Sequence, residues 1–144
     1  MPRNSPETRG RRIILMCPAN RKAAGPRKAI ELYRSPLFYA GRSWALRMQP
    51  DLLMLMSVRH GLVPACEVLD PYPDTLSGMD DAAVNHWADR IAADLRNLDL
   101  TAEDELIILG LSRFAAPLLK RLPQAHAPLI GMTLPEARHW LDKT

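Results

Sequence analysis

The stretch LLMLMSVRHGLVPACEVLDPYPDTL, residues 52–76, decides both the fold and the place of the candidate site. Its first five residues are apolar and are flanked by Pro50 and Ser57. This apolar run is too short for a membrane helix and predicts a strand that is buried on both faces. The residues that follow include Ser57, Arg59, His60, Gly61, Glu67, Asp70, Tyr72, Asp74 and Thr75. Ligands of open α/β sheets bind beyond the carboxyl ends of the strands, so we expect the active or binding site here.

Further apolar runs on either side of this stretch predict more strands. Residues 12–16 (RIILM) and 105–109 (ELIIL) match buried strands, and residues 128–132 (PLIGM) predict a short final strand. Helical patterns lie between the runs, at residues 28–33, 35–48, 80–98, 112–121 and 133–141. Strands that alternate with helices predict a three-layer α/β domain with a mostly parallel sheet of about four strands.

Local start signals mark three of the expected helices. Ser35 precedes Pro36, and proline is favoured at the first helical position. Asp80 places a negative charge at the start of the long helix, where it complements the helix dipole. Thr133 and Glu136 have the spacing of a capping box.

The composition is that of an ordinary globular protein. The 144 residues are 47% hydrophobic and 24% charged, with a net charge of +3. We expect a disordered basic tail over residues 1–10 and a single α/β domain over residues 11–144. No apolar run approaches the about 20 residues of a membrane helix, and the basic start lacks the apolar core of a signal peptide. We therefore expect a cytoplasmic protein without membrane contact.

Familiar nucleotide and metal fingerprints are missing. The chain has no GxGxxG, GxxxxGK[ST] or GxSxG motif, which argues against Rossmann dehydrogenases, P-loop enzymes and α/β-hydrolases. Cys17 and Cys66 lie far apart in the sequence and the four histidines are scattered. We therefore expect free thiols, no metal and no cofactor.

Much of the positive charge lies near the N-terminus. The residues are Arg3, Arg9, Arg11, Arg12, Arg21, Lys22, Arg27 and Lys28. Such a cluster can attract phosphates or nucleic acid. It can equally be a solvated tail followed by a first loop, and the sequence leaves both interpretations open.

Four separate motifs follow the pattern of one protein family. They are Cys17-x-x-x-Arg21-Lys22, Leu32-Tyr33-x-Ser35-Pro36-Leu37-Phe38, Ser57-x-x-His60-Gly61-Leu62-Val63, and Pro71-Tyr72 with Thr75-Leu76. In these motifs, which cover nearly the whole chain after the tail, the sequence resembles a family of small bacterial and phage proteins related to the peroxide-stress protein YaaA. The resemblance implies a Rossmann-like fold and kinship with enzymes that cleave or exchange the N-glycosidic bond of nucleosides, nucleotides or modified bases.

Two positions depart from that family's pattern. Arg59 stands where the family usually has lysine, which keeps the charge but changes its geometry. Pro73 stands where the family commonly has Asp or Asn after Pro-Tyr, and the carboxylate comes one position later, at Asp74. The identity of a catalytic carboxylate therefore stays open among Glu67, Asp70 and Asp74.

Residue chemistry suggests roles for the candidates. Cleavage of an N-glycosidic bond needs a carboxylate near the sugar and an acid that protonates the departing base. The candidate catalytic residues are His60, Glu67, Asp70, Tyr72 and Asp74. The candidate substrate- or phosphate-binding residues are Cys17, Arg21, Lys22, Tyr33, Ser35, Ser57, Arg59, Gly61 and Arg113. Each candidate also has a possible structural role. His60 can bond a backbone carbonyl at the end of a strand, Asp70 can stabilise a turn and Ser35 can cap a helix.

Two functions follow from these candidates, and the residues leave open whether the protein is an enzyme. The first is hydrolysis or exchange of an N-glycosidic bond in a nucleoside, nucleotide or modified nucleobase. The alternative is a non-catalytic module that binds DNA or a nucleotide in a stress or phage-related response. The expected partner is a small nucleoside or nucleotide, with nucleic acid as a second candidate.

Overall fold

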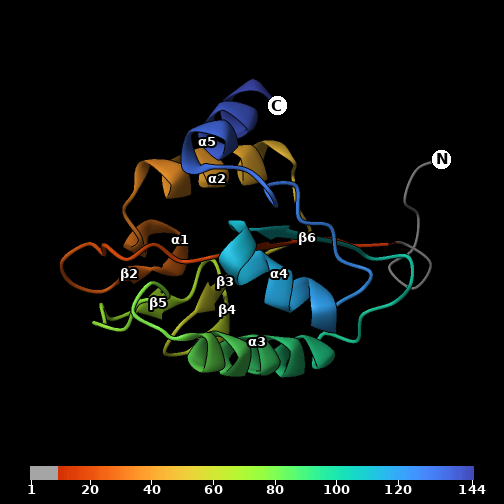
Figure 1. The fold of residues 1–144 in the computed structure, drawn as a ribbon, viewed down its shortest axis with the longest axis horizontal. Coiled ribbons are helices and arrows are strands. Elements are labelled where there is room, and N and C mark those ends of the chain that lie inside the picture. Colours follow the sequence, from red (N-terminus) through yellow and green to blue (C-terminus); the bar gives the residue numbers. More distant parts are fainter. Residues whose placement is uncertain (1–9) are drawn as a thin grey trace.

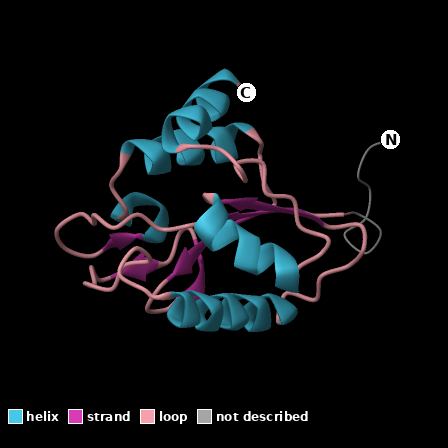
Figure 2. Ribbon diagram, viewed as in Figure 1, coloured by secondary structure: helices cyan, strands magenta, loops and turns pink. Residues whose placement is uncertain are grey.

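The computed structural model describes residues 10–144, which form an α/β structure around a four-stranded sheet (Figure 2). Across the sheet the strands lie in the order β4 (Gly61–Pro64), β3 (Leu52–Ser57), β1 (Arg12–Met16) and β6 (Glu105–Leu109). β1 is parallel to both β3 and β6, whereas β4 runs antiparallel to β3. The expected α/β class and mostly parallel four-stranded sheet are confirmed.

The apolar runs of the sequence form the three parallel strands. Ile14 of β1 lies opposite Leu53 of β3 and Ile107 of β6. Successive residues of β1 alternate between two hydrophobic clusters, since Ile14 belongs to one cluster and both Ile13 and Leu15 belong to the other. A strand with apolar contacts on both faces requires an uninterrupted apolar run, which is the pattern that predicted these strands.

Helices pack against both faces of the sheet (Figure 1). On one face lie α2 (Pro36–Arg47) and α5 (Leu134–Lys143), which contribute to the cluster that contains Ile14. On the other face lie α3 (Asp81–Arg96) and α4 (Ser112–Arg121). The apolar stripes of four amphipathic helices thus close the core from two sides.

The predicted helix starts are present as hydrogen bonds. The Ser35 hydroxyl accepts a bond of 3.0 Å from the backbone N–H of Phe38 at the start of α2. The Asp80 carboxylate accepts one of 2.8 Å from Ala83 at the start of α3. Thr133 caps α5 through a complete capping box. Each bond satisfies a backbone donor that the first helical turn leaves free.

Residues 128–132 do not form the predicted final strand. They form a turn, in which Gly131 has a φ of 80°. The segment that pairs with the sheet edge lies just before them, where the backbone of His126 bonds that of Leu106 and Ile108 at 2.8 Å each. A short apolar run alone does not identify a strand. The fourth strand is instead β4, which lies among the candidate site residues that follow β3.

A second, smaller sheet lies beside the main one. β2 (Arg27–Lys28) pairs antiparallel with β5 (Val68–Leu69). The short helix α1 (Ala29–Leu32) follows β2 directly, in agreement with the expected helical turns over residues 28–33. The backbone N–H of Ala29 donates to the carbonyl of Glu67 at 2.7 Å, which ties the segment before β5 to the start of α1.

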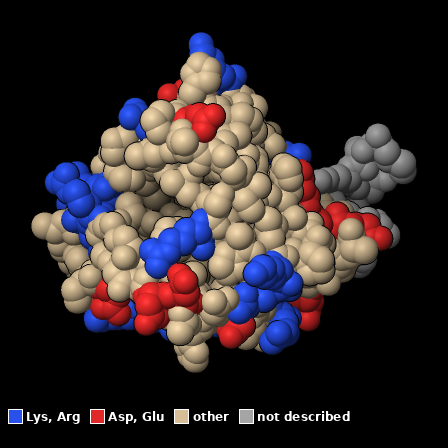
Figure 3. Space-filling model, in the orientation of Figure 1, with Lys and Arg blue, Asp and Glu red and all other residues tan. Residues whose placement is uncertain are grey.

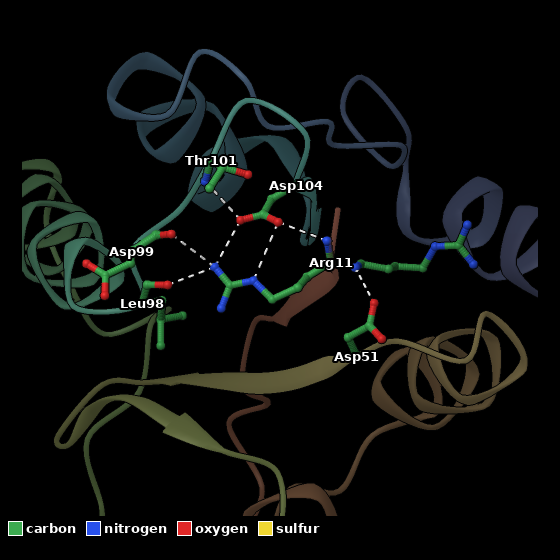
Figure 4. A network of polar contacts seen from close by, with 7 residues as sticks. Arg11, Asp51, Leu98, Asp99, Thr101 and Asp104 are labelled. Carbon is green, nitrogen blue, oxygen red and sulfur yellow. Dashed lines mark hydrogen bonds and ion pairs between the residues drawn. The ribbon is translucent and has the colours of Figure 1, made fainter. Parts of the chain in front are cut away.

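The start of the described chain is fixed by ion pairs, of which Figure 4 shows that between Arg11 and Asp104. The Arg11 guanidinium lies 2.9 Å from the Asp104 carboxylate and donates to the carbonyl of Leu98 at 2.8 Å. Arg12 pairs with Glu105 at 2.7 Å. These two arginines are therefore part of the fold, and the expected tail, with Arg3 and Arg9, lies outside the described residues apart from its last position. No helix in residues 10–144 has the length and apolar character needed to cross a membrane.

Candidate functional site

A cavity of about 420 Å³ opens where β1 and β6 end. Met16 and Leu109, the last residues of the two strands, line it together with Phe38 of α2 and Leu141 of α5. Its volume falls within the range of about 300–1,000 Å³ that is usual for small-molecule sites. Figure 3 shows a hollow on one face of the molecule with Lys and Arg side chains beside it.

The polar lining of this cavity is cationic or neutral. The polar side chains that line it are Asn20, Arg21, Arg34, Ser35, Ser77 and Arg138. Within the described chain, no Asp, Glu or His contributes to the lining. The cavity therefore offers apolar surface and positive charge without a carboxylate or an imidazole.

A buried chain of hydroxyl groups lies at the carboxyl end of β3. The Ser57 hydroxyl donates to the Tyr72 hydroxyl at 2.9 Å, and the hydroxyls of Tyr72 and Tyr33 are 2.6 Å apart. Ser57 also accepts a bond of 3.0 Å from the backbone N–H of His60. Burial is the main reason why the pKa of the Tyr33 hydroxyl is raised, and its bond to Tyr72 adds to this effect. These linked hydroxyl groups hold the loop that contains Tyr72 against the end of β3.

Three cationic or imidazole side chains surround the ring of Tyr72. The Lys22 ammonium lies 4.3 Å from the ring centroid, the Arg59 guanidinium 5.7 Å, and the His60 ring meets it edge-on at 5.5 Å. Arg59 also pairs with Asp74 at 2.9 Å. Burial is the main cause that lowers the pKa of Lys22. Contacts centred on Tyr72 thus bring together seven predicted site residues, which we call the Tyr72 cluster: Lys22, Tyr33, Ser57, Arg59, His60, Tyr72 and Asp74.

The cavity and the Tyr72 cluster share a wall. The Asn20 amide donates to the Ser77 hydroxyl at 2.8 Å, and both residues line the cavity. Lys22 donates to the carbonyl of Asn20 at 3.3 Å and to that of Asp74 at 3.1 Å. The loop after β1 and the loop after β5 therefore meet between the two features.

Two predicted carboxylates lie away from this wall. Glu67 and Asp70 are exposed and flank β5, and neither lines the cavity. β5, which lies between Glu67 and Asp70, pairs with β2 in the smaller sheet and not with a strand of the main sheet. Among the three predicted carboxylates, only Asp74 contacts the Tyr72 cluster through a side-chain ion pair.

Other predicted residues have structural partners. Gly61 starts β4 at a φ of 73°, and a Cβ there would lie 2.5 Å from the Asp94 carboxylate. Arg113 donates to the carbonyl of Met79 at 2.6 Å and lies outside the cavity lining. Tyr33 and Tyr72 are 0% and 4% exposed as residues, so in this structure neither ring offers a free face for stacking on a base.

Three of the predicted binding residues line the cavity itself: Cys17, Arg21 and Ser35. Burial raises the pKa of the Cys17 thiol to about 12, which keeps it protonated at neutral pH. Ser35 uses its hydroxyl as the cap of α2. The structure adds Arg34 and Arg138, which sequence reasoning missed because no local motif marks an isolated arginine.

Residues 13–143 match the family described as "Family of unknown function (DUF6884)". The chain belongs to this family. The matched region includes every residue that lines the cavity and every residue of the Tyr72 cluster. No curated protein and no solved structure matches this DUF6884 member. Within its described residues, no group of three or more His, Cys, Asp and Glu side chains could hold a metal ion.

Proposed function

We propose that the protein binds a nucleoside or nucleotide in the cavity and hydrolyses or exchanges its N-glycosidic bond, within a three-layer Rossmann-like domain of the cytoplasm. One observation carries this proposal: an apolar cavity at the ends of two parallel strands shares a wall with the Tyr72 cluster. Both cysteines are free, as suits a reducing compartment.

The cavity suits the apolar faces of a nucleobase. Phe38, Leu109 and Leu141 supply apolar contact, while Asn20 and Ser77 supply amide and hydroxyl groups at the wall toward the Tyr72 cluster. A few polar groups in a mostly apolar pocket fix the orientation of a small ligand. A base held inside would leave its sugar near the wall.

The Tyr72 cluster contains groups that the reaction needs. A nearby carboxylate stabilises the positive charge of an oxocarbenium-like transition state, and the departing base needs a proton. Asp74, oriented by Arg59 at 2.9 Å, would supply the carboxylate, and His60 the proton. Tyr72, which is buried, would act as a positioning residue for both through Ser57 and its ring contacts.

The test is release of free base from a panel of nucleosides, nucleoside monophosphates and modified bases. We expect Asp74→Asn and His60→Gln to lower the rate by about 10²- to 10⁴-fold. Asp142→Asn and His86→Gln are matched controls, since both residues are exposed and lie outside the cavity lining and the Tyr72 cluster. Glu67→Gln and Asp70→Asn test the other two carboxylates. Absence of base release from every substrate would contradict the proposal.

A second candidate is a non-catalytic nucleotide-binding module. It is favoured by the absence of any Asp, Glu or His among the described residues that line the cavity. This module would bind a nucleotide and leave it intact, so ligand recovered after prolonged incubation would be unchanged. DNA binding through Arg11 and Arg12 is less favoured, because both are engaged in ion pairs within the fold. A mobility shift measured across a salt series tests DNA binding directly.

A further inference from the structure

Most described arginines have a side-chain partner, and three of the five that lack one line the cavity. Arg59, Arg113 and Arg121, for example, each form an ion pair. The arginines whose side chains find no hydrogen-bond or ion-pair partner within residues 10–144 are Arg21, Arg27, Arg34, Arg96 and Arg138. Three of these, Arg21, Arg34 and Arg138, line the cavity.

Arg21 and Arg34 lie opposite each other on two paired segments of backbone. The N–H of Arg34 donates to the carbonyl of Arg21 at 2.8 Å, next to the antiparallel bridge between Lys22 and Tyr33. Like charges directly opposite in an antiparallel pair destabilise the fold. Among the described residues, no carboxylate lines the cavity and neutralises these two positive charges. The carboxylate of Asp74, which is nearby, is paired with Arg59. The two guanidinium groups, both on exposed residues, are therefore available to an anion that enters the cavity.

The start of α4 adds positive potential at the same cavity. Leu111, the N-cap residue, lines the cavity and gives the ten-residue helix no side-chain cap. The hydroxyl of Ser112 instead accepts a bond of 2.7 Å from the backbone N–H of Gly131. The amino end of a helix carries a partial positive charge and favours phosphate groups. This feature reinforces the arginines, which carry the argument.

We propose that the cavity is a site for a monophosphate ester, with the phosphate between Arg21 and Arg34 and the organic group against Phe38, Leu109 and Leu141. This inference rests on the proposed function and narrows its substrate class to nucleoside monophosphates. A guanidinium forms two parallel bonds to a phosphate, and two opposed guanidinium groups match its double charge and three free oxygens. A carboxylate, with one negative charge, would neutralise only one of the two guanidinium groups.

The experiment measures binding of four probes by titration calorimetry: adenosine, adenosine 5′-monophosphate, adenosine 5′-carboxylate and inorganic phosphate, with the guanosine series in parallel. We expect the monophosphate to bind at least about tenfold more tightly than the nucleoside, because each charge-assisted bond contributes strongly. Arg21→Gln and Arg34→Gln should each lower affinity for the monophosphate by about tenfold or more and leave affinity for the nucleoside unchanged. Arg27→Gln is the control, since Arg27 is exposed, has no side-chain partner in the described chain and lies outside the lining.

The melting temperature of the ligand-free variants shows whether the two arginines are structural. Removing one of two opposed like charges should leave this temperature unchanged or raise it, whereas a structural arginine would lower it. Equal affinity for nucleoside and monophosphate, tighter binding of the 5′-carboxylate, or affinities unaffected by both substitutions would overturn the inference.

Failure of this inference and failure of the proposed function give different results. Base release that is equal for nucleosides and monophosphates, and unaffected by Arg21→Gln and Arg34→Gln, would refute the phosphate site and leave the glycosidase proposal standing. Arginine-dependent binding of the monophosphate without base release would support the phosphate site and contradict the glycosidase proposal.

Discussion

The thiol of Cys17 fills the space beside Gly110, where the neighbouring strands β1 and β6 end. A Cβ built on Gly110 would lie 2.5 Å from the Cys17 sulfur. The backbone N–H of Cys17 also donates to the carbonyl of Leu109 at 3.0 Å, so the two chain segments approach closely just where the cavity begins. Position 110 therefore lacks room for a side chain as long as residue 17 is cysteine.

Gly110→Ala should lower the free energy of unfolding by about 1–3 kcal/mol, the usual cost of forcing extra atoms into a packed site. Adding Cys17→Ala should recover part of this loss, because it removes the sulfur that the new methyl group meets. Urea unfolding of the two single variants and the double variant measures the coupling. Strictly additive losses would show that the sulfur is not the obstacle.

Tyr72→Phe should destabilise the protein by about 1–3 kcal/mol, the penalty for buried polar groups that lose their partner. The Tyr72 hydroxyl accepts bonds from Ser57 and from the backbone N–H of Val58, and is bonded to Tyr33. Tyr33→Phe should cost less, since it removes only the last of these bonds. Tyr39→Phe, at an exposed tyrosine, is the control for thermal unfolding. A loss no larger for Tyr72→Phe than for this control would contradict the proposed positioning role.

Asp104 should make stability depend on pH in the acid range. Its hydrogen bonds with Arg11 are the main cause that lowers the pKa of the carboxyl from 3.8 to about 2. A carboxyl whose pKa is lower in the folded state stabilises the fold above its unfolded pKa, so this contribution, about 2 kcal/mol, is present above about pH 4 and is lost as the pH falls toward 2.

Asp104→Asn tests this assignment. The variant should be less stable than the parent by about 2 kcal/mol at pH 7, and the two unfolding curves should converge as the pH approaches 2. Urea titrations at intervals between pH 7 and pH 2 give the comparison. A difference that stays constant over this range would mean that Asp104 acts through packing and not through its charge.

The sequence predicted the elements whose signals are local. The runs that became β1, β3 and β6 are apolar except at one end, because both of their faces are buried. Ser35 and Thr133 mark helix starts by bonds within one turn. β4 (Gly61–Pro64) escaped prediction because its glycine and proline resemble turn residues.

The site was predictable in part for the same reason. Residues that directly follow β3, such as His60, are placed by the strand, and Tyr72 reaches them because its hydroxyl bonds Ser57. The position of Glu67 depends on the pairing of β5 with β2. Each of these strands has two residues, and no sequence pattern predicts that they pair. Arg138 enters the cavity only because α5 packs on α2, a long-range contact.

Alkylation of Cys17 should be slow and should report on the cavity. In a Cys66→Ser background Cys17 is the one remaining thiol, and its pKa of about 12 leaves a thiolate fraction of about 10⁻⁴ at pH 8. We expect iodoacetamide to modify it about a thousandfold more slowly than free cysteine, with a rate that rises about tenfold per pH unit up to about pH 11.

The parent protein, in which Cys66 is exposed, should show one fast and one slow thiol. Mass spectrometry of the modified peptides separates the two. A Cys17 that reacts as fast as free cysteine at pH 8 would contradict the raised pKa of its thiol.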